Sequence, residues 1–275
     1  MSSEIYDSAV SRVGVIDTIR SLWAHRTLIR LLVARDVTVR YKRSVFGVAW
    51  TLLNPLMTSA VLWFVFSRIF AAHLPNGVQY APYVLAGILF STFFTQGITL
   101  AAESVAGGAG ILTKVYVPPQ VFALATALAN AVNFSIGLLA LTIVSLLTAD
   151  GIAWTAPLTL VFMISMIMLI TGLGLILSVA YIRFDDMRNI VGVLVMITTY
   201  LTPVFYPKSI LGTRTREIVD LNPLTSYIEV FRSVFSANGA ATWQSWAYMI
   251  GTALISWIIG TRLFARAWPR IVAML

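Results

Sequence analysis

Six long stretches without Asp, Glu, Lys or Arg constrain this chain more than any other feature of its sequence. They cover residues 44–67, 69–102, 115–149, 151–182, 189–207 and 233–261. A helix needs about 20 apolar residues to cross the hydrocarbon core of a bilayer. The chain is 59% hydrophobic and 11% charged, whereas soluble domains carry about 25% charged residues. This balance excludes a soluble globule and a disordered chain, and it predicts an integral membrane protein.

Turn-forming residues place six predicted membrane-spanning helices within these stretches. Residues 73–77, HLPNG, form a predicted turn, Pro118 and Pro119 precede the third span, and Pro203 and Pro207 end a short fifth span. The predicted spans cover about 45–67, 80–102, 119–148, 156–181, 189–206 and 243–262. We therefore expect an all-α fold in which a six-span domain, 45–275, follows an amino-terminal segment, 1–44.

The basic residues predict the orientation of these spans. Six crossings return the chain to the side on which it began. That side carries 14 of the 19 basic residues, namely Arg12, Arg20, Arg26, Arg30, Arg35, Arg40, Lys42, Arg43, Lys114, Arg183, Arg188, Arg262, Arg266 and Arg270. The other side carries Arg68, Lys208, Arg214, Arg216 and Arg232. The positive-inside rule places both termini on the cytoplasmic side of the membrane, which we expect to be a bacterial inner membrane. Because the charges alternate with apolar runs, we expect anionic headgroups rather than nucleic acid as their partners.

Two segments outside the spans carry further predictions. Residues 15–43 resemble an amphipathic helix at the membrane interface, interrupted near His25, because six apolar residues gather on one helical side: Ile19, Leu22, Trp23, Ile29, Val33 and Val37. A plain basic tail that only sets orientation is the alternative. The segment lacks the apolar core of a secretory signal. The external stretch 207–242 is too long for a tight connection, so we expect short helices within it.

The residue inventory argues against chemistry in this chain. The sequence has no Cys and two His, and its one close acidic pair is Asp185 and Asp186, whose adjacent carboxylates point about 100° apart on a helix. The segment 103–119 has glycines and Lys114 but not the spacing of a phosphate-binding loop. No acidic or basic residue stands in the middle of a predicted span, as ion-coupled carriers usually require. We therefore expect no catalytic residue, metal or cofactor, and an energy source in another protein.

Several short motifs, in this order and at this spacing, resemble the membrane subunit of type-2 ATP-binding-cassette exporters. The strongest is residues 35–55, which read RDVTVRYKRSVFGVAWTLLNP, close to the family pattern R-Y-K-x-S-x-L-G-x-x-W except for Phe46. The others are KVYVP at 114–118, YIRFDD at 181–186, TPVFYP at 202–207, and NPL at 222–224 leading into Phe231 and Arg232. In the third motif Phe184 interrupts the usual Arg-Asp pair. The most similar branch exports lipid-linked polysaccharides such as O-antigen, teichoic acid and mycobacterial galactan.

The resemblance implies a homodimer of this chain that works with two copies of an ATPase subunit, which would bind ATP and Mg²⁺. It implies that the lipid-linked glycan is admitted sideways between the first and fifth spans. The residues implied to contact the ATPase are Lys114, Tyr116, Pro118, Arg183, Asp185 and Asp186. The candidates for the lateral gate and channel are Trp50, Asn54, Pro55, Thr199, Tyr200 and Tyr206.

The basic cluster before the first span is open to two interpretations. Arg40, Tyr41, Lys42 and Arg43 stand at the depth of a lipid pyrophosphate, which Arg and Lys bind well. The same charges are also typical of residues that only fix orientation and hold anionic lipid.

Three other functions are alternatives to polysaccharide export, and one further expectation is structural. A type-2 exporter of teichoic acid, a drug or a small lipid shares the six spans, and a membrane enzyme acting on polyprenyl lipids would need acidic clusters for Mg²⁺. A passive channel is disfavoured, since no charged or carbonyl filter is evident. Inside the spans, Asn130 and Asn133 are expected to form hydrogen bonds between helices.

Overall fold

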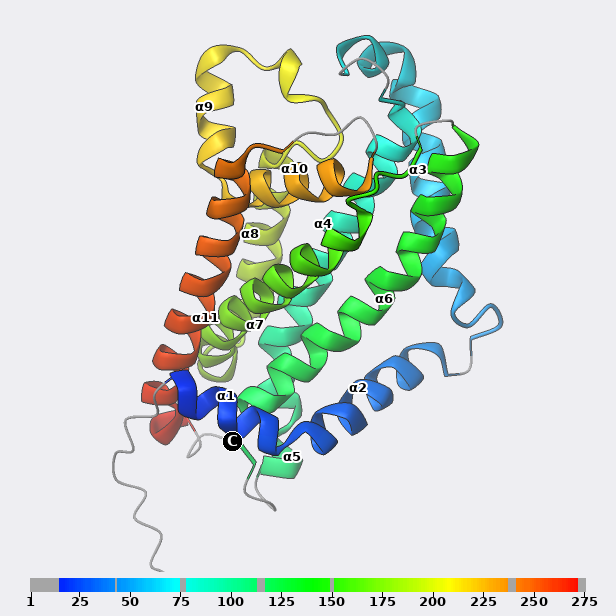
Figure 1. Cartoon of the computed structure of the whole chain (residues 1–275). Coiled ribbons are helices and arrows are strands. Elements are labelled where there is room, and N and C mark those ends of the chain that lie inside the picture. The colour runs from blue at the N-terminus through cyan, green and yellow to red at the C-terminus, as the bar shows by residue number, and fades with distance from the viewer. Residues whose placement is uncertain are drawn as a thin grey trace, which may run out of the picture.

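The computed structural model describes residues 15–42, 44–74, 78–112, 117–148, 151–236 and 241–271. Within these ranges the chain forms helices and no strand beyond a single antiparallel bridge between Ile152 and Ser236. Figure 1 shows a bundle of long helices with short helices at both ends. Helices α1 (Val15–Ala24), α2 (Arg26–Tyr41) and α5 (Ala109–Leu112) lie at one end. Helices α9 (Thr213–Leu221) and α10 (Pro223–Phe235) lie at the other.

Five helices in the described ranges are long and apolar enough to cross a membrane, not the six predicted. They are α3 (Ala49–Phe70), α4 (Tyr80–Gly107), α6 (Gln120–Leu147), α7 (Thr159–Arg183) and α11 (Trp243–Ile271). Short 3₁₀ turns extend α3 (Ala71–His73), precede α7 (Ala156–Leu158) and follow α8 (Lys208–Ile210).

The predicted fifth span is the short helix α8 (Met187–Leu201). At about 1.5 Å per residue, its 15 residues rise about 22 Å, less than the roughly 30 Å of the hydrocarbon core. The helix ends five residues before the predicted boundary at 206. Thr202 adopts an extended conformation, φ −82° and ψ 138°, because Pro203 disfavours helical dihedrals in the residue before it.

The amino-terminal helices break at His25, whose φ of −94° and ψ of 19° lie outside the helical region. Its Nδ1 lies 2.8 Å from the Ser21 carbonyl oxygen. The predicted apolar side is divided between two environments. Leu22 and Ile29 are buried against α6 and α11, whereas Ile19 and Trp23 are 54% and 72% exposed. These helices therefore pack on the protein with only part of their apolar surface.

The core is built around α4, which packs against α3, α6 and α7. Its centre is a group of phenylalanines from four helices. The centre of the Phe162 ring of α7 lies 4.9 Å from the centre of the Phe231 ring of α10. The centre of the Phe93 ring of α4 lies 4.7 Å from that of the Phe134 ring of α6. These side chains are almost fully buried. Helix α10 is thereby fixed across the end of the bundle.

Helices α7 and α11 approach each other backbone to backbone. A Cβ on Gly260 would lie 2.2 Å from the Gly172 carbonyl oxygen, and one on Gly172 would lie 2.3 Å from that of Ser256. The Ser256 hydroxyl also donates to the Leu169 carbonyl, at 3.1 Å. Small residues at helix contacts are typical of membrane proteins, where close packing replaces the hydrophobic effect.

Candidate functional site

The carboxyl-terminal turn of α2 is fixed to two spanning helices by Tyr41. Its hydroxyl donates to the Asn133 side-chain oxygen of α6, at 2.5 Å, and lies 2.5 Å from the Thr51 hydroxyl of α3. The second predicted amide, Asn130, donates to the Phe93 carbonyl of α4 at 2.7 Å. The prediction that Asn130 and Asn133 form hydrogen bonds between helices is therefore confirmed.

A cavity of about 440 Å³ lies beside this contact, and we call it the α2–α3 cavity. It brings together residues that sequence analysis assigned to two separate groups. Arg40 and Tyr41 come from the basic cluster, and Trp50, Asn54 and Pro55 come from the proposed gate. The remaining lining includes Gln96, whose side-chain oxygen accepts a hydrogen bond from Arg40 at 3.3 Å, and Asn133.

Asn133 gives this cavity an unsatisfied donor. Its side-chain nitrogen is buried and has no hydrogen-bond partner among the described residues. A buried donor without a partner costs about 1–3 kcal/mol, and an acceptor group placed in the cavity would remove that cost. At the mouth, Arg40 and Asn54 are exposed. The cavity is thus lined by a guanidinium, a phenol and four side-chain amides, of Asn54, Gln96, Asn130 and Asn133.

Of the other two members of the basic cluster, the structure describes one. Lys42 is exposed and does not line the cavity. Arg43 lies outside the described residues. Position 47 allows the turn between the cluster and α3, because Gly47 has a φ of +49°, which favours glycine, and its amide donates to the Ser44 hydroxyl at 3.1 Å.

The other gate candidates lie elsewhere. Thr199 and Tyr200 are on α8, and Tyr200 is 65% exposed. The Tyr206 hydroxyl donates to the Tyr200 carbonyl at 3.2 Å, and the Tyr206 carbonyl accepts from the Tyr83 hydroxyl at 3.0 Å. None of the three lines the α2–α3 cavity, although their neighbour Phe205 does.

The residues expected to contact an ATPase are only partly described. Lys114 and Tyr116 lie outside the described residues, and Pro118 precedes α6. Arg183, Asp185 and Asp186 are exposed in the connection from α7 to α8. This connection is reinforced nearby by an ion pair of 2.9 Å between Arg188 and Glu103, which joins α8 to α4. No group of three or more His, Asp or Glu that could hold a metal occurs within the described ranges.

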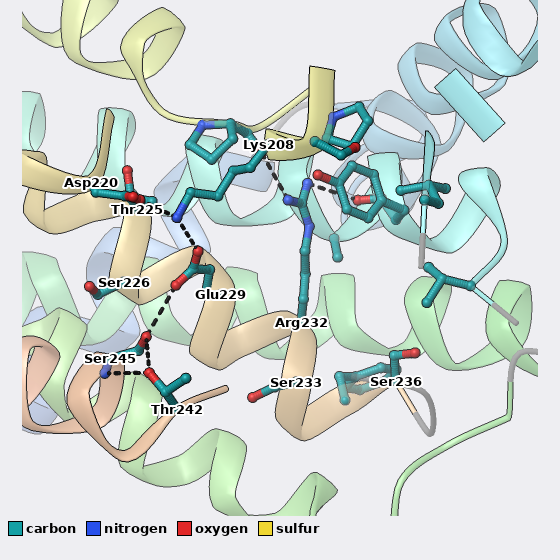
Figure 2. Close-up of a pocket in the computed structure, with 18 of the residues that line it drawn as sticks. Lys208, Asp220, Thr225, Ser226, Glu229, Arg232, Ser233, Ser236, Thr242 and Ser245 are labelled. Atoms are coloured by element: carbon teal, nitrogen blue, oxygen red, sulfur yellow. Dashed lines mark hydrogen bonds and ion pairs between the residues drawn. The ribbon is translucent and has the colours of Figure 1, made fainter. Parts of the chain in front are cut away.

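Sequence analysis missed a larger polar site at the opposite end of the bundle. Figure 2 shows it along one side of α10. The Lys208 ammonium contacts the carboxylates of Asp220 and Glu229. The Arg232 guanidinium lies 3.5 Å from the centre of the Tyr83 ring and donates to the carbonyls of Pro203 and Val204, at 2.8 and 2.6 Å. A polar residue every three or four positions over 226–236 was the available signal.

The chain is similar to known membrane proteins over most of its length. Residues 27–236 match the family described as ABC-2 type transporter. An O-antigen export system permease protein RfbA of Klebsiella pneumoniae is 25% identical over 254 residues, which cover 90% of this chain and 95% of that protein. RfbA of Myxococcus xanthus is 26% identical over 80% of this chain and 85% of its own length. The capsule polysaccharide export inner-membrane protein CtrC of Neisseria meningitidis is 21% identical, over 90% and 94%.

Proposed function

This chain belongs to the ABC-2 type transporter family, and from that premise we propose that it is the membrane subunit of an exporter for a lipid-linked polysaccharide. The substrate would be an O-antigen or a galactan-like cell-wall polymer, which leaves the cytoplasm across the bacterial inner membrane. Relatives matched over most of their length are named as O-antigen and capsule polysaccharide permeases, which supports a glycan over a drug or a small lipid.

The observation that most supports a binding site for the substrate is the α2–α3 cavity. A polyprenyl pyrophosphate carrier has an anionic head and an apolar tail. In the cavity, the Arg40 guanidinium and the unpartnered Asn133 nitrogen are donors for the head. Alongside, the exposed apolar side of α3 suits the tail, since Met57 and Phe64 are 63% and 80% exposed. Arg40, Tyr41, Lys42 and Arg43 are proposed to receive the headgroup, with Trp50, Asn54 and Pro55 beside it.

Energy would come from a separate ATPase subunit, which would bind ATP and Mg²⁺. Its proposed docking surface comprises the connection 103–119, with Lys114, Tyr116 and Pro118, and the exposed Arg183, Asp185 and Asp186. Support comes from the position of α5 beside α1 and α2 at one end of the bundle (Figure 1), and from the family itself. We expect no ATP hydrolysis by the purified chain and clear hydrolysis by its complex with the partner.

The finer topology is also proposed. The α1–α2 end would face the cytoplasm with both termini, because most basic residues lie on that side. Helices α1 and α2 would lie at the interface, with Ile19 and Trp23 in lipid. The sixth crossing would be made by α8 together with the extended residues after Thr202. Such a backbone is tolerated at membrane depth where protein covers its polar groups, and Arg232 binds the carbonyls of Pro203 and Val204.

We propose a homodimer in which apolar surface on α3 and α8 is shared between two copies. On α3, Phe64 and Val61 are 80% and 62% exposed, and on α8, Leu194 and Ile197 are 54% and 53% exposed. These faces are available to a second protomer and to the lipid part of the substrate. A glycan channel would then run between the protomers, with Thr199, Tyr200 and Tyr206 near it.

The test is a conservative exchange in a strain that lacks the chromosomal gene. We expect deletion to abolish surface polysaccharide and the unaltered gene to restore it. Arg40→Lys with Arg43→Lys keeps the charge but removes bidentate hydrogen bonding. A charge-assisted hydrogen bond contributes about 1.5–3 kcal/mol, so we expect export to fall about tenfold at equal protein level.

The matched control is Arg262→Lys with Arg266→Lys, which alters two exposed arginines of α11 that line neither cavity. It should leave export unchanged. Normal export by the Arg40 and Arg43 variant would remove the headgroup role and leave a role in orientation. Normal surface polysaccharide after deletion of the gene would reject the proposed function.

A further inference from the structure

A second cavity, of about 1030 Å³, lies at the end of the bundle opposite α1 and α2, and we call it the α10 cavity. Its walls come from the start of α4, the residues after α8, and helices α9, α10 and α11. Small-molecule sites usually occupy roughly 300–1,000 Å³, so the cavity can hold a ligand of several rings. It shares no lining residue with the α2–α3 cavity.

Helix α10 supplies a larger share of the polar lining than any other element. Ser226, Glu229, Ser233 and Ser236 follow one another at helical spacing and face the cavity (Figure 2). The opposite side of α10 is buried in the core through Leu224, Tyr227, Ile228, Phe231 and Val234. An amphipathic helix normally turns its polar side to bulk water. Here that side borders a concave, partly open cavity, into which a polar ligand can fit.

The cationic groups in the wall are largely engaged. Burial lowers the pKa of the Lys208 ammonium, but the hydrogen bonds that it donates to Asp220 and Glu229 outweigh that effect, so its pKa lies above the ordinary value. Arg232 donates to three main-chain carbonyls, of Pro203, Val204 and Tyr83. The third basic residue, Arg216, is exposed on α9. Two of the three Lys and Arg side chains in the wall are therefore held by protein groups, and Arg216 alone among them is left open to an anion.

The hydroxyl and carboxylate oxygens of the wall, in contrast, can still accept hydrogen bonds from a ligand. Several hydroxyls already donate to protein oxygens, as Ser233 does to Val230 at 2.8 Å and Thr225 does to Val219 at 2.6 Å. Their oxygen lone pairs remain for a ligand. The Glu229 carboxylate accepts from Lys208 and from the Ser245 hydroxyl, at 2.5 and 3.1 Å, and a carboxylate has about four acceptor positions. A matching ligand brings many hydroxyl donors and no charge.

An aromatic ring completes the arrangement. Tyr248 of α11 lines the cavity and is 42% exposed, and its hydroxyl donates to the Leu221 carbonyl at 3.2 Å, which fixes the ring. Amphipathic rings of this kind contact ligands that are apolar on one face and polar at the edge. A sugar has this form, with C–H groups on its face and hydroxyls around it.

We propose that the α10 cavity is a carbohydrate site that binds a short neutral segment of the glycan after it has crossed the membrane. The inference rests on the proposed function, which supplies the glycan and places this end outside. Glu229 would accept hydrogen bonds from sugar hydroxyls, with Tyr248 beneath the ring. The rival interpretation is purely structural: the charges would only join α9, α10 and α11.

The experiment uses cysteine labelling, because the chain has no native cysteine. Ser233→Cys places one small thiol in the cavity, and Thr213→Cys places one on the exposed start of α9, outside the lining. The full chain in nanodiscs is labelled with a membrane-impermeant maleimide. The probes are neutral oligosaccharides cut from the host's surface polysaccharide and, separately, inorganic pyrophosphate.

We expect the oligosaccharides to slow labelling of Ser233→Cys, about tenfold at nine times the dissociation constant, since only empty sites react. Labelling of Thr213→Cys should not change. Adding Glu229→Gln to Ser233→Cys should raise the half-protecting concentration about fivefold, because neutral hydrogen bonds are about half as strong as charge-assisted ones. Glutamine retains an acceptor for Lys208, so the folded wall is kept.

Each result decides the proposal. Protection that fades in the Glu229→Gln variant supports it. Unchanged labelling with the oligosaccharides, or protection by pyrophosphate instead, overturns it. The gene-deletion test is separate: lost surface polysaccharide with no protection rejects this site alone, whereas normal surface polysaccharide rejects the proposed function.

Discussion

Helices α3 and α4 are neighbours of similar length and apolar character, yet they are packed in opposite ways. In the most apolar part of α4, 72% of residues are buried inside the protomer, whereas in α3 the share is 6%. Helix α4 is enclosed by α3, α6 and α7, while α3 packs mainly against α4 and α6. Two similar sequences thus occupy the centre and the rim of the same bundle.

The difference shows that apolar character does not decide burial in this protein. Lipid tails are as apolar as leucine, so a helix gains little from leaving lipid for another helix. Helix α4 differs in its surface shape, because Gly97 and Gly87 let neighbouring helices and loops approach closely. Helix α3 instead carries large side chains such as Met57, Val61 and Phe64 on its outer side.

The largest expected effect is at the phenylalanine core. Phe162→Ala removes a fully buried ring in contact with Phe231. The transfer part of the usual cost is small in lipid, so we expect the cavity part, about 2–3 kcal/mol, to lower stability. Phe64→Ala, at an 80% exposed ring of α3, should change stability by less than about 0.5 kcal/mol. Thermal unfolding of both variants in detergent checks this. An equal loss at Phe64 would show that this ring is buried against protein in detergent, as it would be in the proposed homodimer.

The next effect distinguishes two glycines of α11. Gly260→Ala places a methyl group against the Gly172 carbonyl, at 2.2 Å, so α7 and α11 must separate. Overpacking of this kind costs about 1–3 kcal/mol. Gly251→Ala adds the same methyl where no atom lies within 4 Å, and the better helix propensity of alanine should stabilise slightly. The two variants should shift the unfolding midpoint in opposite directions. A matching shift would mean that the α7–α11 contact is looser than described.

A smaller effect is expected where α3 is held at the rim. Tyr41→Phe removes the hydroxyl that joins α2 to Thr51 and Asn133. One such hydrogen bond contributes about 1 kcal/mol. We expect faster amide exchange in α2 and little change in α4, measured by mass spectrometry. Tyr200→Phe, at a 65% exposed residue of α8, is the control. Faster exchange throughout the core would show that the rim and centre unfold together.

The smallest effect at neutral pH concerns Lys208. Because its pKa in the folded chain lies above the ordinary value of 10.5, its ion pairs stabilise fully at neutral pH. That contribution is lost as pH rises through the folded pKa. Lys208→Gln should therefore lower the free energy of unfolding at neutral pH, by about 1 kcal/mol or less, since the ion pairs are partly exposed. The difference from the unaltered chain should shrink above pH 10.5. A constant difference at all pH values would exclude an electrostatic origin.

Much of the fold follows from local sequence. Most of each long helix lies within an uncharged stretch, and α4 begins at Tyr80 and α11 at Trp243, where the predicted spans begin. The break at His25 and the helices within 207–242 also agree with expectation. The fifth span was placed too far, since Pro203 was treated as its end although it already disfavours helix at Thr202.

The candidate sites were less accessible to sequence. Arg40 and Tyr41 were singled out by a motif, but their meeting with Gln96 and Asn133 depends on how α2 packs across α4 and α6. Lys208, Asp220 and Glu229 come from three separate elements, so no local pattern joins them. The polar side of α10 was visible as a period, but not that a cavity lies beside it.

By itself, the sequence determined that this chain enters a membrane, where its helices lie, and which family it resembles. Those properties depend on residues taken one segment at a time, because the bilayer sorts charged from apolar segments locally. Only the tertiary structure decided that α4 is enclosed while α3 is not, that Gly172 meets Gly260, and that two polar cavities form. These depend on the fit between side chains distant in sequence. A face toward lipid and a face toward another helix are equally apolar, so composition cannot tell them apart.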